Sequence, residues 1–196
     1  MEFIETIKDR VRHLKRKKIV LPETDDIRVL KAASIVLKED FADIILIGKK
    51  EEILSISKQE NLDLESCSFV DPKTFFDREL LIDHYYELRK HKNITHEEAE
   101  KALLDYPTFG AMLVRLGYAD GMVSGAVHSS ADTLRVALQI IKTSKIQTAS
   151  SFFLMVTPRV EYGSDGVFVY SDCGMNQNPT SEQLVDIAYS SAETFR

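Results

Sequence analysis

The sequence predicts an α/β protein built around a parallel sheet. Short apolar runs that suit buried strands occur at Ile19–Leu21 and Asp43–Ile47, and the segment between them has the spacing of an amphipathic helix. Alternation of strand and helix is typical of a parallel sheet, because each parallel pair needs a crossover that a helix can provide. Hydrophobic residues make up 44% and charged residues 29% of the 196, which is ordinary for a globular protein with a substantial core.

The chain is expected to open with a helix. Its apolar residues recur at helical spacing, at Phe3, Ile4, Ile7, Val11 and Leu14. The cations Lys15, Arg16, Lys17 and Lys18 follow directly, and we expect them at the C-terminal end of this helix, where the helix dipole favours positive charge. After the first strand, a second helix is predicted over 25–38, with Thr24 or Asp25 as its N-cap.

The middle of the chain continues the alternation and then becomes helical. The predicted elements are a helix over 49–57, a strand over 68–70, and helices over 74–89, 95–104 and 107–116. The second of these three helices begins with a capping box, in which Thr95 and Glu98 each satisfy the exposed N–H of the other residue. Gly117 is suited to end the third.

A strand, a loop of small residues and a helix start follow at 120–135. The strand is expected over 120–123, Ser124 and Gly125 let the chain turn closely, and Ser129 or Ser130 is expected as the N-cap. N–H groups in the unfinished first turn point outward, and the dipole favours negative charge there. This order of elements therefore predicts an anion site, with phosphate as its natural ligand.

Arg135 lies inside that helix. A cation near a helix N-terminus opposes the dipole by roughly 0.3–1 kcal/mol, so Arg135 is better explained if a bound anion or a nearby carboxylate compensates it. The alternative is an ordinary ion pair with Asp132, three residues earlier. The local pattern leaves both interpretations open.

The character of the chain changes near Ser144, where we predict a boundary between a first domain, 1–144, and the beginning of a second α/β domain, 145–196. Segments 150–156 and 167–170 are rich in strand-forming residues, and 162–166 has the composition of a hairpin turn. Thr180 and Gln183 form a second predicted capping box. The helix that they open runs to Arg196 without a Gly or Pro, so the chain is expected to stop within this second domain.

Composition argues against several classes of function. A net charge of -6 and a pI near 5.4 are not typical of nucleic-acid-binding domains, which usually display a basic face. Apolar runs are far shorter than the roughly 20 residues that span a bilayer, and the N-terminus lacks an apolar signal core, so we expect a cytoplasmic protein without a membrane interaction. The two cysteines match no metal spacing and no disulfide framework, and no metal site is expected.

Several segments, in order along the chain, closely resemble the phosphate acetyltransferase (phosphotransacetylase) family. They are Val20-Leu-Pro-Glu23 with Arg28-Val-Leu-Lys-Ala-Ala33; Tyr86-Glu-Leu-Arg-Lys-His-Lys92; Asp120-Gly-Met-Val-Ser-Gly-Ala126 with His128-Ser-Ser-Ala-Asp-Thr-Leu-Arg135; and Ser150-Ser-Phe-Phe-Leu-Met155 with Ser171-Asp-Cys173 and Asn176-Gln-Asn-Pro-Thr180. The resemblance covers nearly the whole chain, and it is therefore more specific than any one motif.

The resemblance implies an acyltransferase that moves an acetyl group reversibly between acetyl phosphate and coenzyme A. It also implies a two-domain architecture like that of the isocitrate dehydrogenase group, with the site in the cleft between the domains, and a homodimer. Coenzyme A is then a substrate, and no tightly bound cofactor is expected. The expected partners are small-molecule substrates, with no nucleic acid.

The resemblance assigns contacts with coenzyme A or phosphate to Arg135 and Arg89. The other residues expected to contact the substrate are Ser124, Gly125, His128, Ser129, Ser130, Thr133, Asn176 and Asn178. From the residue types alone, His128 is also explained as a hydrogen-bonded positioning group, and the two asparagines as turn formers.

The main departure from the family pattern is the absence of a Ser-Arg pair with a following Asp. In the family that Arg holds the acyl phosphate and that Asp acts as base toward the thiol, so the catalytic residues are expected downstream of Arg196 and this chain is expected to be an inactive N-terminal portion. Two alternatives stay open. They are a phosphate butyryltransferase with a roomier acyl pocket, and a related domain that binds acyl-CoA without turning it over.

Overall fold

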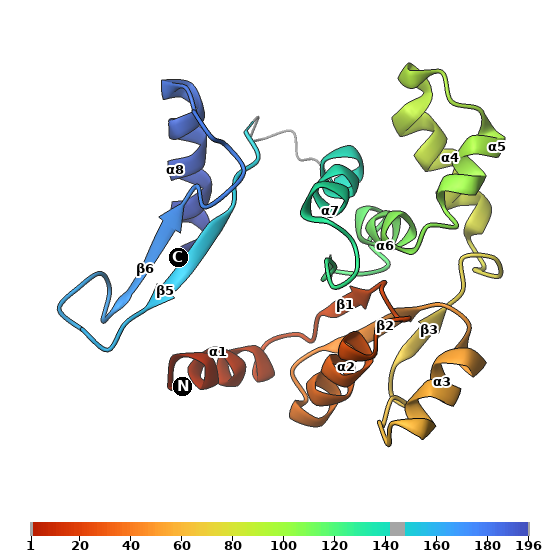
Figure 1. Cartoon of the computed structure of the whole chain (residues 1–196), viewed down its shortest axis with the longest axis horizontal. Helices are drawn as coiled ribbons and strands as arrows, with labels where there is room; N and C mark the ends of the chain where they lie inside the picture. Colours follow the sequence, from red (N-terminus) through yellow and green to blue (C-terminus); the bar gives the residue numbers. More distant parts are fainter. Residues whose placement is uncertain (1, 142–147, 196) are drawn as a thin grey trace. The chain divides into compact units, whose positions relative to one another are not determined.

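The protein is represented by a computed structural model that describes residues 2–141 and 148–195. The chain forms two compact units, 1–142 and 143–196 (Figure 1). The boundary predicted near Ser144 lies outside the described residues and stays a prediction. Within the described part of the chain, no helix combines the length and the apolar character needed to cross a membrane.

The first unit contains a four-stranded parallel sheet. Its strands are β1 (Lys18–Leu21), β2 (Asp43–Ile47), β3 (Ser68–Val70) and β4 (Gly121–Met122), in the spatial order β3-β2-β1-β4. Val20 of β1 is level with Ile45 of β2 and with Met122 of β4. The predicted α/β class with a parallel sheet is therefore confirmed.

Helices cover both faces of this sheet, and alternate strand residues point to each. Leu21, Ile44 and Leu46 pack toward α2 (Ile27–Glu39) and α3 (Lys50–Gln59). Val20, Ile45 and Ile47 face the other cluster, which includes residues of α4 (Arg78–Arg89), α5 (His96–Ala102) and α6 (Tyr106–Arg115). Such near-continuous apolar runs are what strands buried on both faces require.

The remaining elements of the first unit are α1 (Glu2–Arg12), a 3₁₀ turn η1 (Lys90–Lys92), α7 (Ser130–Val136) and a π-helical turn η2 (Ala137–Ile141). The capping box of Thr95 and Glu98 forms as predicted. Gly117, at φ +80°, takes the left-handed conformation directly after α6.

The cations of 15–18 do not lie at the end of α1, and that prediction is wrong. The helix ends at Arg12, and Lys18 already belongs to β1. Arg16 instead forms ion pairs with Asp40 and Asp43, at 2.6 and 2.9 Å. Lys17 pairs with Asp120 at 2.7 Å. Carboxylates near the amino end of the sheet thus pair with Arg16 and Lys17.

The predicted N-cap of α2 is also wrong. Asp26, rather than Thr24 or Asp25, accepts the backbone N–H of Arg28 at 2.8 Å. The hydroxyl of Thr24 is buried and donates to the carbonyl of Ile47 at 2.6 Å. It therefore joins the segment that follows β1 to the end of β2.

The second unit consists of a hairpin and a helix. β5 (Phe152–Val156) pairs antiparallel with β6 (Val167–Ser171), and α8 (Ser181–Phe195) packs on β6. The predicted capping box is present, since Thr180 and Gln183 exchange hydrogen bonds at 2.8 and 3.3 Å.

Candidate substrate-binding site

The carboxyl ends of β1 and β4 lie side by side, because the two strands are parallel neighbours. β2 and β3 extend the sheet on one side of β1, and β4 lies on the other side. The strand order therefore reverses between β1 and β4. In open α/β sheets, such a reversal leaves a crevice at the carboxyl ends, where ligands usually bind. Residues 22–24 after β1 and residues 123–129 after β4 meet at this point.

Glu23 is at the centre of this meeting point. Its side chain is 2% exposed, and its carboxylate accepts hydrogen bonds of 2.7–3.0 Å from the consecutive backbone N–H groups of residues 125, 126, 127 and 128. Nδ1 of His128 lies 2.8 Å from the same carboxylate. Burial raises the pKa of Glu23, but the hydrogen bonds from His128, Val127 and Ala126 outweigh burial and hold the pKa well below its ordinary value. Glu23 is therefore an ionised group that orders the loop.

This contact changes what the loop can offer to a substrate. The N–H of Gly125, predicted to contact the substrate, donates to the protein's own carboxylate. Gly125 has φ +113°, a conformation that glycine adopts without strain. Ser129 is the N-cap of α7, one of the two predicted positions, and Ser130 is the exposed first residue of that helix. The groups left free to contact a ligand are therefore mainly side chains.

A cavity of about 250 Å³ lies beside this loop, and residues of α6 and α7 contribute to its wall. Most of the residues that line it have polar or charged side chains; the lining residues are Asp105, Pro107, Thr108, His128, Asp132, Thr133, Arg135, Val136 and Gln139. Three of the residues predicted to bind the substrate, His128, Thr133 and Arg135, thus share one cavity.

Arg135 forms an ion pair with Asp132 in this cavity, with 2.7 Å between Nη1 and Oδ1. The i,i+3 pair that the sequence left open as an alternative is therefore present. Both side chains remain substantially exposed, and exposed pairs of this kind contribute about 0–1 kcal/mol. An incoming anion can thus take over the guanidinium at small cost.

The neighbours of His128 favour the protonated form of its imidazole. The hydrogen bond with Glu23 raises the pKa of the imidazole, and the negative charges of Asp105 and Asp132 act in the same direction. The cavity wall therefore combines the guanidinium of Arg135 and the imidazole of His128 with the carboxylates of Asp105 and Asp132.

Two hydroxyl groups near the loop are buried without a hydrogen-bond partner among the described residues. They are Oγ of Ser124 and Oγ1 of Thr133. Buried hydroxyls are usually satisfied, so these two are groups whose donors a ligand can use. A Cβ at Gly125 would lie 3.8 Å from Oγ1 of Thr133, which shows how closely the loop approaches α7.

Arg89 ends α4 and lies near the cavity without lining it. Burial raises the pKa of the neighbouring Tyr85, and Arg89 opposes that rise by its charge and a hydrogen bond. Asp105, which lines the cavity, acts on the same Tyr85.

Asn176 and Asn178 belong to the second unit, which we describe by itself. The amide of Asn176 donates to Asp172 at 2.8 Å and to the carbonyl of Ala149 at 2.9 Å. Asp172 also accepts backbone N–H groups from Ser151 and from residues 174–176. The hydroxyl of Ser151 donates to Asp172 as well. This hydrogen bond has the largest effect, and together with the others it holds the pKa of Asp172 well below its ordinary value. Asn178 is exposed.

Glu23 and Asp172 are the residues that reasoning from the sequence missed as organisers of loops. Each follows directly on a strand, or one residue beyond it, and each collects the N–H groups of a motif loop. An acidic residue just past a strand was the available signal. Within the described residues, no group of three His, Cys, Asp or Glu side chains is placed to hold a metal ion.

Comparison with known proteins finds similarity over nearly the whole chain. The sequence pattern of the family described as Phosphate acetyl/butaryl transferase matches residues 2–196. The chain belongs to this family. The crystal structure of a phosphotransacetylase from Streptococcus pyogenes matches this chain with a TM-score of 0.88 at 37% sequence identity. The match covers 98% of this phosphate acetyl/butaryl transferase family member.

Two further relatives set the extent of the similarity. The phosphate acetyltransferase of Thermoanaerobacterium thermosaccharolyticum is 45% identical over 197 residues, which are 100% of this chain and 59% of that enzyme. The EutD phosphotransacetylase of Staphylococcus aureus has a TM-score of 0.85 at 36% identity, and the match covers 98% of this chain and 56% of that one. This family member thus spans somewhat more than half the length of these two relatives, their N-terminal portion.

Proposed function

We propose that this chain carries a substrate-binding part of a phosphate acetyltransferase, the enzyme that converts acetyl phosphate and coenzyme A to acetyl-CoA and phosphate and back. The observation that supports this most is the cavity beside the Glu23-ordered loop, because it places the motif residues His128, Thr133 and Arg135 together at the reversal of the sheet. Both substrates carry phosphate groups, and the guanidinium of Arg135, the imidazole of His128 and the hydroxyl of Thr133 are hydrogen-bond donors that suit such a ligand.

The residues of this chain would act by binding and orientation. Arg135 exchanges Asp132 for a phosphate oxygen, and Ser124 and Thr133 donate their unpaired hydroxyls. Arg89 adds positive charge at the edge of the cavity. Ser129 and Ser130 extend the row of hydroxyls along the loop, while Asn176 and Asn178 orient substrate from the second unit.

The chemical step needs a base in addition to these groups. The sulfur of coenzyme A attacks the carbonyl carbon of acetyl phosphate, a C–S bond forms, the C–O bond to phosphate breaks, and the thiol proton goes to the base. We assign no described residue as that base. The proposal therefore places it in the part of the family's enzymes that this chain does not span, and the chain alone is expected to bind but not to turn over.

The proposal includes the finer features that the resemblance implies. They are an isocitrate dehydrogenase-like arrangement of two domains with the site between them, a homodimer, a cytoplasmic location, and coenzyme A as a substrate with no tightly bound cofactor.

The first test is binding of coenzyme A to this chain by isothermal titration calorimetry. Removing the guanidinium in Arg135→Ala is expected to weaken binding at least tenfold, which corresponds to about 1.4 kcal/mol. Arg12→Ala is the matched control, because Arg12 forms the same kind of i,i+3 pair, with Asp9 at 2.6 Å, on a helix that does not line the cavity. Equal binding by the two variants would remove Arg135 from the site.

The second test is thioester formation from coenzyme A with acetyl and butyryl phosphate. It compares this chain alone with the same chain joined to the remaining part of the Thermoanaerobacterium enzyme. Activity only in the joined protein supports the proposal, and the preferred acyl phosphate decides between acetyl and butyryl transfer. Turnover by the chain alone would contradict it, and binding without turnover in either form would indicate an acyl-CoA-binding domain instead.

A further inference from the structure

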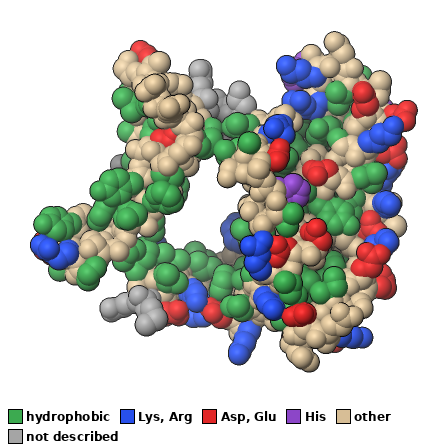
Figure 2. Space-filling model, viewed as in Figure 1, with side chains coloured by type: hydrophobic (Ala, Val, Ile, Leu, Met, Phe, Trp, Pro, Cys, Tyr) green, Lys and Arg blue, Asp and Glu red, His purple; other side chains and the backbone are tan. Residues whose placement is uncertain are grey.

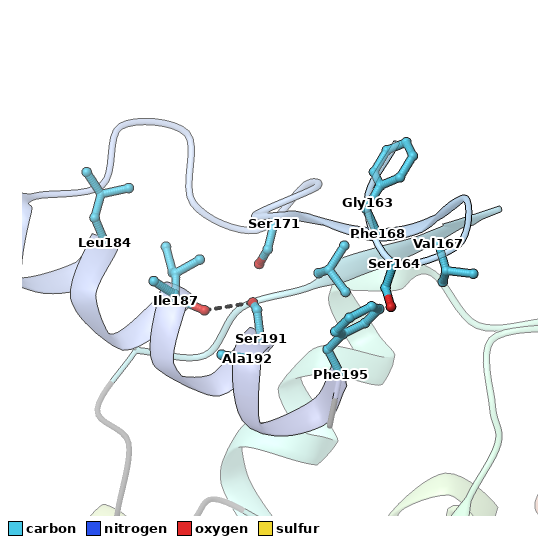
Figure 3. A pocket seen from close by; sticks show the side chains of 12 residues that line it. Gly163, Ser164, Val167, Phe168, Ser171, Leu184, Ile187, Ser191, Ala192 and Phe195 are labelled. Atoms are coloured by element: carbon cyan, nitrogen blue, oxygen red, sulfur yellow. Dashed lines mark hydrogen bonds between the residues drawn. The ribbon is translucent and has the colours of Figure 1, made fainter. Parts of the chain in front are cut away.

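Two cavities of this chain differ in the ligands that suit them. One, of about 510 Å³, lies in the second unit between β6 and α8, and the residues that line it are all uncharged. Its side chains are mostly apolar, and the hydroxyl of Ser191 donates to the carbonyl of Ile187 at 2.7 Å (Figure 3). Figure 2 shows hydrophobic side chains gathered along β5, β6 and α8, whereas charges of both signs are spread over the first unit. A phosphate group therefore suits the cavity of the first unit, which contains Arg135 and His128.

His128 is held in that cavity at two points by one carboxylate oxygen. Oε1 of Glu23 accepts the backbone N–H of His128 at 3.0 Å and lies 2.8 Å from Nδ1 of its ring. The carboxylate is buried, and its bonds to the consecutive N–H groups of 125–128 fix the loop from which the ring projects. Glu23 thus sets the orientation of the imidazole, and Nε2 is the ring nitrogen left for a ligand.

The same contact decides which ring nitrogen carries a proton. Glu23 is ionised, since its hydrogen bonds outweigh burial and hold its pKa well below the ordinary value, and an ionised carboxylate only accepts hydrogen bonds. Nδ1 is therefore the donor in this pair. In the neutral imidazole Nε2 is then an acceptor, whereas in the protonated imidazole Nε2–H is a donor. The oxygens of a phosphate dianion are also acceptors, so they can bond to Nε2 only when it carries a proton.

Charged groups from each element around the ring act on this proton. They are Glu23 after β1, Asp105 before α6, Asp132 and Arg135 on α7, and Arg28 of α2, which pairs with Asp26 and donates to the loop carbonyl of Ala126 at 2.7 Å. The hydrogen bond with Glu23 raises the pKa of His128, burial opposes it, and the charges of Asp105 and Asp132 add to the rise. Arg135 disfavours a second cation in the cavity, so a phosphate group that neutralises its guanidinium favours the imidazolium.

We propose that a phosphate group binds in this cavity together with a proton from the solvent on Nε2 of His128, and that Glu23 is the positioning residue that fixes the ring for this. The proposal rests on the proposed function, because it concerns the same substrate site. Nε2–H donates to one phosphate oxygen while the guanidinium of Arg135 bonds to another. The affinity for phosphate groups is thereby coupled to pH.

The direction of this coupling follows from the binding form of the imidazole. Affinity is full below the pKa of His128 in the free protein, which the bond with Glu23 raises above the ordinary value of 6.5, and it falls as the pH rises through that pKa. A phosphate monoester stays a dianion over this range, since its second pKa is about 6. Conversely, a bound phosphate group raises the pKa of His128, because the coupling is reciprocal.

The first measurement is NMR of the imidazole nitrogens during a pH titration, with and without inorganic phosphate. Neutral His128 should carry its proton on Nδ1, and phosphate should raise its titration midpoint. Glu23→Gln should lower that midpoint, because it removes the carboxylate charge. His96 is the matched control, since its Nδ1 lies 3.6 Å from Oδ1 of Asp83 on helices that do not line the cavity, and its midpoint should not move.

The second measurement is calorimetry of coenzyme A binding at pH 8 in two buffers of different ionisation enthalpy, which counts the protons taken up. The wild type should take up more protons than His128→Asn, and this comparison cancels any proton that coenzyme A itself exchanges. Asparagine keeps an amide donor for Glu23 and lacks Nε2, so the loop should keep its fold. His128→Asn should bind roughly fivefold or more weakly at pH 7, and His96→Asn should behave as the wild type.

The proposal is overturned by a neutral His128 with its proton on Nε2, by a midpoint that phosphate leaves unchanged, or by equal proton uptake in the wild type and His128→Asn. Failure of the proposed function gives a different result. Coenzyme A then binds Arg135→Ala as it binds the wild type, or binds neither, and the phosphate titration of His128 alone decides the present inference. If coenzyme A binding depends on Arg135 but not on the proton of His128, the proposed function stands and this inference fails.

Discussion

Replacing Glu23 by glutamine tests the carboxylate that orders the loop of 125–128. Its oxygens accept four backbone N–H groups and lie 2.8 Å from Nδ1 of His128. Glutamine offers one oxygen, and its amide nitrogen is a donor that would face backbone N–H donors. At least two N–H groups then lose their acceptor in a site that is 2% exposed.

The cost follows from those two donors. Leaving a buried donor unsatisfied costs about 1–3 kcal/mol, so Glu23→Gln should lower the free energy of unfolding by roughly 2–6 kcal/mol. In a protein of this size, each kcal/mol lowers the melting temperature by about 2–4 °C. The melting temperature should therefore fall by at least about 4 °C in thermal unfolding followed by circular dichroism, and the amides of 125–128 should lose protection from hydrogen exchange.

The same substitution should change the acid sensitivity of the protein. Because the folded-state pKa of Glu23 is depressed below the ordinary value of 4.5, its contribution to stability is complete above pH 4.5 and is lost as the pH falls below that value. The wild-type protein should lose its stability advantage over Glu23→Gln in that acidic window.

Asp26→Asn is the matched control for this experiment. It makes the same carboxyl-to-amide change three residues away, at the N-cap of α2, where asparagine caps about as well as aspartate. Glu23→Gln stability within about 0.5 kcal/mol of the wild type, the usual range for a neutral surface substitution, with unchanged protection at 125–128, would refute the role assigned to Glu23.

Two further predictions concern packing and thiol reactivity. Gly110→Ala should destabilise the protein by about 1–3 kcal/mol in chemical denaturation, because the new Cβ would lie 2.9 Å from Sδ of Met122 and 3.0 Å from Cγ1 of Val20. Gly174→Ala is the control and should be neutral, since its new Cβ would have no atom within 4 Å. Equal stability of the two variants would show that the side chains around Gly110 move aside and would contradict the prediction. Burial raises the pKa of the Cys67 thiol to about 12, so a thiol reagent at pH 8 should modify the partly exposed Cys173 in the native protein and Cys67 only after unfolding. Equal rates at both cysteines in the native protein would contradict this.

The strands of the first unit, though not their order in the sheet, could be predicted from local sequence alone. The strand of 43–47 has the predicted bounds, and the strand predicted from residue 19 begins one residue earlier, because apolar runs of that length have few alternatives once helices flank them. The ends of helices were harder to predict. Asp26 is the N-cap of α2, whereas the hydroxyl of Thr24 donates to a carbonyl on a neighbouring strand, a contact that depends on which strands are adjacent.

The residue types of the site could be predicted from the sequence, but the contacts between these residues could not. The local pattern gave Ser129 as one of two possible N-caps, and the structure has Ser129 as the cap. The pattern did not decide whether Arg135 binds an anion or pairs with Asp132, and the structure contains the ion pair with Asp132. The contact between Glu23 and the loop joins residues 102–105 positions apart. No local periodicity contains that information, since it follows from the order of strands in the sheet.

This long separation also fixes when the loop can form during folding. Contacts between residues far apart in the chain form late, because the loop-closure entropy of the intervening segment must first be offset by other contacts. The segment between Glu23 and Gly125 contains α2 to α6 and three of the four strands that make up the first unit's sheet. A chain emerging during synthesis therefore has no cavity to offer until β4 joins β1, and occupancy by a ligand would report that assembly of the first unit is complete.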